Sequence, residues 1–114
     1  MFQIYSRARI KEGQLDALRA TMAGAVEATK SHDGVLSYQF YVSHDGKTFH
    51  GVESFRDEAA MGAHMAALGS NLDGLFALLE NMEVTVLGEV ANELKASLAP
   101  FSPSFAGPLA GFTL

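Results

Sequence analysis

The sequence predicts a single α+β domain in which helices cover one face of an antiparallel sheet. Four stretches of the chain alternate apolar and polar residues, with the two-residue period of a strand that buries one face. Between the first and second of these, and between the third and fourth, apolar residues recur every three or four positions, as in an amphipathic helix. The resulting order, βαββααβ, consists of two strand–helix units around a hairpin, which is the ferredoxin-like pattern.

The first strand is predicted over residues 2–10, and a long helix follows it. One face of the strand carries apolar or small side chains, from Phe2, Ile4, Ser6, Ala8 and Ile10. Gly13 breaks the alternation, and helical spacing then continues until Asp33 and Gly34 stop the helix. The apolar positions of that helix are Leu15, Leu18, Met22, Ala25, Val26 and Thr29.

A hairpin is predicted in the middle of the chain. Residues 36–42 alternate, and the following Asp45 and Gly46 suit a tight turn. Residues 49–55 complete the hairpin. Within this second arm Glu53 and Phe55 point to the same face, because side chains two residues apart in a strand share a side of the sheet.

The second half of the chain predicts a helix that carries His64 and then a shorter one. Asp57 is a suitable N-cap, since its carboxylate can accept free amide hydrogens of the first turn. An interruption is expected around Gly69, and the short helix is expected to run through Leu72 and to end near Asn81. The last strand is predicted over residues 83–90.

The chain divides into a ferredoxin-like domain over residues 1–98 and a tail over residues 99–114. Residues 91–98 are expected to form one or two helical turns. Three prolines in the tail, Pro100, Pro103 and Pro108, forbid a regular helix there. The tail is too apolar for a disordered linker, so it is expected to be extended and packed on the domain or on a partner subunit.

Length and composition exclude several classes of function. A chain of 114 residues with 48% hydrophobic content builds one core, not two. The net charge of -5 and the scattered basic residues argue against nucleic acid as a partner. With no cysteine, disulfides, thiolate nucleophiles and iron–sulfur clusters are excluded. No apolar run approaches the roughly 20 residues that cross a bilayer, and no signal peptide is evident, so a cytoplasmic protein without membrane contact is expected.

His64 and Glu53 are the candidate catalytic residues. His64 lies on the apolar face of its helix, and an imidazole changes protonation near neutral pH, so it is able to act as a general base or as a hydrogen-bond donor. The alternative is a packing histidine that fills space in the core. Glu53 is placed to orient the imidazole or to bind a substrate hydroxyl, and its alternative is an ion pair with a surface Arg or Lys.

An aromatic wall is the candidate substrate-binding surface. It consists of Tyr38, Phe40, Phe49 and Phe55, with Met61, Tyr5 and Ser6 nearby. Such a wall suits a planar ring, although aromatic residues at alternating strand positions also serve as core. No metal site is expected, because His50 faces away from Glu53 and no third ligand is present. His32, after the first helix, and His44, in the hairpin turn, are not expected to be catalytic.

Several of these features together resemble the antibiotic biosynthesis monooxygenase family. They are a strand that ends in Glu53-Ser54-Phe55, then the run Asp57-Glu58-Ala59-Ala60, and His64 six residues after Glu58. The opening strand with its Lys11-Glu12-Gly13 turn, the Gly34–Tyr38 start of the second strand and the Val-rich last strand extend the resemblance over nearly the whole chain. The resemblance implies a dimeric α+β barrel of two ferredoxin-like units.

The resemblance also implies an activity. Some members of the family oxygenate phenols, quinols or polycyclic anthrones with O2 and no cofactor, so the expected function is a cofactor-independent monooxygenase acting on a small aromatic, quinol or polyketide-like substrate. Haem degradation is less favoured, because the tryptophan typical of those sites is missing. The alternatives are a non-catalytic dimeric barrel of the stress-response type that binds a small apolar ligand, and an isomerase-like relative.

A homodimer is expected from the sheet itself. The helices leave one face of the sheet bare, and either Tyr41 and Val52 or Tyr38 and Phe40 must lie on that face. An identical sheet from a second copy supplies a complementary apolar surface without requiring a new sequence.

Overall fold

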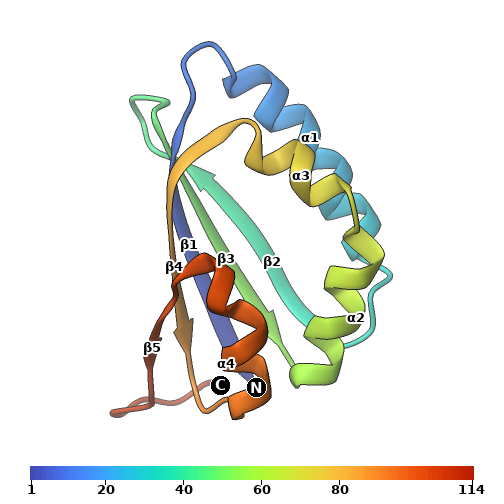
Figure 1. Cartoon of the computed structure of the whole chain (residues 1–114), viewed down its shortest axis with the longest axis vertical. Coiled ribbons are helices and arrows are strands. Elements are labelled where there is room, and N and C mark those ends of the chain that lie inside the picture. Colours follow the sequence, from blue (N-terminus) through green and yellow to red (C-terminus); the bar gives the residue numbers. More distant parts are fainter.

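A five-stranded sheet with helices on one side forms the framework of the protein (Figure 1). The computed structural model describes all residues 1–114. The strands are β1 (Phe2–Ile10), β2 (Val35–Val42), β3 (Thr48–Phe55), β4 (Leu79–Leu87) and β5 (Ser104–Ala106). The helices are α1 (Leu15–Thr29), α2 (Glu58–Leu68), α3 (Asn71–Phe76) and α4 (Asn92–Leu98), with a 3-10 turn η1 (Ala99–Phe101).

The strand order β2-β3-β1-β4-β5 contains the ferredoxin-like arrangement that the sequence predicts. β1 lies between β3 and β4 and is antiparallel to both. Its pairing places Ile4 opposite Glu53 on one side and opposite Val86 on the other. The fold class predicted from the alternation and spacing of apolar residues is therefore confirmed.

β5 was not predicted. The tail was expected to be extended, and three of its residues pair in parallel with β4, with Phe105 opposite Val86. The free backbone groups at the edge of β4 accept this addition. The last residues of the chain remain exposed, including Leu109 and Phe112.

The helix that carries His64 begins as predicted. The Asp57 side chain accepts a hydrogen bond from the Ala60 amide at 2.8 Å, so Asp57 is the N-cap of α2. Gly69, whose φ is 49°, ends this helix in a conformation that favours glycine.

The predicted boundary between the short helix and the last strand is wrong. α3 ends at Phe76, and β4 begins at Leu79 rather than at residue 83. Leu79 fits the spacing of the helix, but it is buried as a strand residue opposite Ile10. Tertiary pairing therefore overrides the local periodicity. Asn81 adopts a positive φ of 55°, next to an irregularity in the pairing of β1 with β4.

Two clusters of buried side chains fill the space between the sheet and the helices. One surrounds the start of β1 and joins it to α2 and α4, through Phe2, Ile4, Phe55, Met61, Val84, Val86, Leu94 and Leu98. The other surrounds the end of β1 and joins it to α1, through Ala8, Ile10, Leu18, Met22, Phe49 and Leu79. Members of both clusters line the cavity described below, among them Ile4 and Phe55 of the first and Phe49 of the second.

The opposite face of the sheet, which we call the open face, is largely polar. Gln3 donates to the Ser54 hydroxyl at 3.0 Å, and the Tyr5 hydroxyl hydrogen-bonds to Nδ1 of His50 at 2.7 Å. Tyr41 remains 52% exposed. None of the helices is long and apolar enough to span a membrane.

Candidate functional site

An apolar cavity of about 80 Å³ lies between the sheet and the helices. Its floor comes from β1, β2, β3 and β4, and its walls come from α2, α3, the end of α4 and η1. Of its 17 lining residues 15 are hydrophobic, and Ser6 and Glu53 are the two others. A charged group in such surroundings faces little competition from water, so its interactions with a bound molecule are strong.

Most of the residues predicted from the sequence line this cavity. Glu53 is among them, with Tyr38, Phe40, Phe49, Phe55, Met61 and Ser6. Tyr5 does not line the cavity. The prediction that it lies beside Ser6 in the site is therefore wrong for this cavity. Consecutive strand residues point to opposite faces, so Tyr5 lies on the open face with His50.

Close packing within β1, β2 and β3 shapes the cavity floor. Gly51 lies under it, and a Cβ atom at this position would stand 2.6 Å from the Ser6 hydroxyl oxygen and 2.9 Å from the Phe40 ring. Phe40 in turn stacks on Phe49, with ring centroids 5.6 Å apart. The absence of a side chain at residue 51 therefore lets the aromatic wall lie directly on the sheet.

His64 is buried behind the cavity wall, with 1% of its surface exposed. Its ring packs edge-on against Tyr38 with centroids 5.1 Å apart, and against Phe55 at 5.6 Å. Its Nε2 lies 3.7 Å from Oε1 of Glu53 and has no hydrogen-bond partner. Glu53 thus stands between the imidazole and the cavity, and the ion pair with a surface Arg or Lys considered above does not form.

The other ring nitrogen of His64 meets His32. The two Nδ1 atoms are 2.8 Å apart, and the rings pack edge to face with centroids 5.1 Å apart. His32 is partly exposed and lies in the turn between α1 and β2. Sequence reasoning missed this contact because the two residues are 32 positions apart and come together only when the turn packs against α2. Its position just after a long helix was the one available signal.

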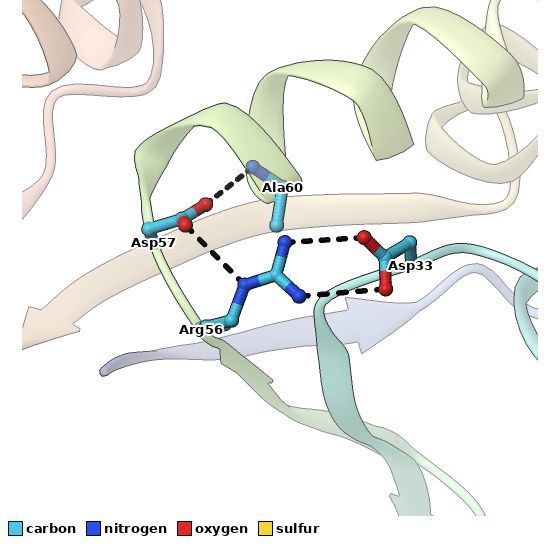
Figure 2. Close-up of polar contacts among 4 residues, drawn as sticks. All are labelled: Asp33, Arg56, Asp57 and Ala60. Atoms are coloured by element: carbon cyan, nitrogen blue, oxygen red, sulfur yellow. Dashed lines mark hydrogen bonds and ion pairs between the residues drawn. The ribbon is translucent and has the colours of Figure 1, made fainter.

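A charged network holds that turn against the start of α2 (Figure 2). The Arg56 guanidinium lies between two carboxylates, donating to Asp33 at 3.2 and 3.4 Å and to Asp57 at 3.3 Å. The Ala60 amide, and after it Arg56, hold the pKa of Asp57 below its ordinary value. Asp33 and Asp57 in turn raise the pKa of Arg56. The backbone amide of Arg56 also donates to the Gly34 carbonyl at 2.8 Å, which fixes the turn beside α2.

Tyr38 remains a neutral phenol at this site. Burial, and then the negative charge of Glu53, raise its pKa from 10.0 to about 12. Near neutral pH its hydroxyl therefore keeps its proton and does not serve as a base.

The arrangement suits the transfer of protons. No group of three or more His, Asp or Glu side chains gathers closely enough to hold a metal ion. What the site offers is a carboxylate in an apolar cavity, an imidazole behind it and a second imidazole at the surface. These features define a ferredoxin-like domain with a carboxylate and an imidazole sheltered between its sheet and its helices.

The chain belongs to the antibiotic biosynthesis monooxygenase family, whose sequence profile matches residues 1–68. The matched segment includes both Glu53 and His64. A comparison with curated proteins finds no significant match.

Solved structures have the same fold. The crystal structure of MupZ from Pseudomonas fluorescens aligns with a TM-score of 0.83 and 24% identity over 99% of this chain and 88% of that one. Protein SO0527 from Shewanella oneidensis aligns with a TM-score of 0.61 and 31% identity over 74% of this chain and 87% of that one. Rv0793 from Mycobacterium tuberculosis aligns with a TM-score of 0.69 and 26% identity over 80% of this chain and 96% of that one. The alignment with MupZ therefore extends over the tail.

Proposed function

We propose that the protein is a cofactor-independent monooxygenase that acts on a small aromatic, quinol or polyketide-like substrate. The observation that carries the proposal is the carboxylate of Glu53, which lines an apolar cavity while Nε2 of His64 lies unpartnered 3.7 Å behind it. Membership of the antibiotic biosynthesis monooxygenase family supports the reaction type.

The first step of the proposed reaction is removal of a substrate proton. A methylene group beside a phenolic ring loses its proton to the Glu53–His64 pair, and the electron pair left behind spreads into the ring. The gap of 3.7 Å between Glu53 and His64 is long for proton transfer, but such distances tighten when substrate is bound.

Oxygen enters in the second step. The carbanion adds to O2, and a proton returned by the site converts the adduct into a hydroperoxide. Loss of water from this hydroperoxide breaks the O–O bond and the remaining C–H bond and leaves a carbonyl. One oxygen atom stays in the product and the other leaves in water, so the substrate itself supplies all the electrons. The protein has to hold the carbanion and keep bulk water away.

A substrate of this kind requires the cavity to open. Sites for drug-sized ligands measure about 300–1,000 Å³, whereas this cavity measures about 80 Å³. Phe76 of α3 and Phe101 of η1 both line it and contact one another, with ring centroids 5.8 Å apart. Separation of these two rings is the movement that would enlarge the cavity from the helix side.

The proposal is tested by oxygen uptake with a panel of anthrones and quinols. We expect uptake by the wild-type protein and a loss of about 100-fold or more in Glu53→Gln and in His64→Gln, the range in which general acid–base catalysis contributes. The matched control is His50→Gln, which changes a histidine on the open face and is expected to alter the rate less than 2-fold.

Circular dichroism checks that each variant is folded. Uptake that continues at the wild-type rate in Glu53→Gln would remove the pair from the mechanism. Tight binding of the panel without any uptake would favour the alternative in which the barrel binds an apolar ligand and catalyses nothing.

A further inference from the structure

We propose that His32 is a proton-relay residue that connects the buried His64 to solvent. This inference deepens the proposed function, on which its role in turnover depends. The structure places the groups of this path in sequence: Glu53 lines the cavity, Nε2 of His64 lies 3.7 Å from Oε1 of Glu53, and the other side of the His64 ring is hydrogen-bonded to the partly exposed His32.

The need for a relay follows from the burial of His64. Its side chain is fully enclosed, and 15 of the 17 residues around the adjoining cavity are hydrophobic. Tyr38, which packs on the ring, keeps its own proton because its pKa is about 12. A proton taken from a substrate therefore has no exit into water directly from His64.

The contact with His32 provides that exit. Two Nδ1 atoms 2.8 Å apart share one hydrogen, so one ring donates and the other accepts. His64 is the donor before the reaction. When its Nε2 gains a proton from Glu53, its Nδ1–H bond breaks and a new N–H bond forms at Nδ1 of His32. His32, which is partly exposed, then releases the proton on its Nε2 to water.

This transfer leaves both rings neutral but reverses the direction of their hydrogen bond. The second half of the proposed reaction restores it, because the oxygen adduct needs one proton to become a hydroperoxide. That proton enters at Nε2 of His32 and leaves from Nε2 of His64, through the same bonds in reverse order. One proton leaves the cavity and one returns in each turnover, so the pair ends each turnover as it began.

The groups around the pair favour a fixed geometry. His64 faces Glu53 from β3 and Tyr38 from β2. Asp33, the residue after His32, is bound by Arg56, which also bonds to the N-cap of α2 (Figure 2). The turn that carries His32 is thereby tied to the helix that carries His64, and this keeps the two rings in contact.

The test measures how fast the ring N–H of His64 exchanges with water, in ligand-free protein labelled with ¹⁵N-histidine. The relay predicts that exchange falls at least 10-fold in His32→Gln, because glutamine keeps a hydrogen-bonding group but cannot pass a proton on. The matched control is His44→Gln, which changes the histidine of the hairpin turn and is expected to leave the rate within 2-fold. An unchanged exchange rate in folded His32→Gln would overturn the proposal.

A second measurement needs no variant. A hydrogen bond between the two Nδ1 atoms gives a scalar coupling between two histidine nitrogens in the wild-type protein, and its absence would also overturn the proposal. Neither readout requires turnover, so the relay can stand if no substrate is ever oxygenated. If oxygen uptake is found, His32→Gln should slow it, and added imidazole should restore the rate in His32→Gln but not in Glu53→Gln.

Discussion

The two faces of the sheet use the same kinds of residue in opposite ways. On the covered side, His64 of α2 packs against Tyr38 and is 1% exposed, and the only hydrogen bond of its side chain is to another histidine. On the open face, His50 is partly exposed and hydrogen-bonds to Tyr5 at 2.7 Å. Water contacts the partly exposed His50 directly, whereas protons reach the enclosed His64 only through other side chains. The burial of a histidine, and not its residue type alone, therefore limits the groups with which its ring can exchange protons.

The largest expected difference between the faces is in stability. Phe55 is fully buried on the covered face and packs on Phe2 with ring centroids 5.6 Å apart. We expect Phe55→Ala to lower the free energy of unfolding by about 3–5 kcal/mol, because it removes a buried ring and leaves a cavity. Val52, on the same strand, lies on the open face and is only partly buried in the single chain, so Val52→Ala should cost less than about 1.5 kcal/mol.

Urea unfolding of the two variants measures this difference. If both lost the same stability, the open face would be as tightly packed as the core. Partial burial in the single chain would then not determine the cost of the substitution at Val52.

The next effect concerns what covers the open face. We expect a homodimer in solution that buries this face, since Tyr41 is 52% exposed there. Light scattering should give twice the chain mass of 12.2 kDa. Tyr41→Glu should weaken dimerisation at least 10-fold, because it replaces an exposed aromatic side chain with a charge that would lose its water in the contact. Ala20→Glu, at an exposed position of α1 on the helix side, should leave the mass unchanged. A wild-type mass of one chain would refute the dimer.

The smallest effect is the alkaline titration of the covered face. The pKa of Tyr38 is raised to about 12 in the folded protein, by burial and then by Glu53, from 10.0. Between these values the unfolded chain loses the phenol proton while the folded chain keeps it. Stability should therefore decrease as pH rises from about 10 to about 12.

Urea midpoints across this pH range measure the slope. We expect Tyr38→Phe to reduce this slope. An equal slope in Tyr38→Phe and wild-type protein would mean that Tyr38 ionises as readily in the folded state as in the unfolded one.

Much of the covered face could be predicted from the sequence, since strand alternation assigns residues to faces directly. This placed Glu53 and Phe55 together and His50 apart from them, and the N-cap at Asp57 followed from local chemistry. Tyr5 was assigned to the site although the same alternation puts it on the open face. The prediction of the fold thus succeeded where short-range periodicity determines the structure.

The remaining features depend on contacts between distant segments. The pairing of Leu79 with Ile10 moved the start of β4, and the edge of β4 captured three residues of the tail. The contact between His32 and His64 depends on how the turn after α1 packs against α2, which Arg56 fixes through two carboxylates. Periodicity carries no information about such contacts, because they arise from the packing of the complete fold.

The short strand β5 has a consequence for how copies of the protein meet. Sheet edges with free backbone groups are the places where chains add to one another and aggregate. Residues 104–106 pair with the last three residues of β4 and cover that end of its edge, whereas β2 has no neighbour along its outer side. Addition of a further strand is thereby hindered at the end of β4 that the tail covers, and the rest of that edge remains open.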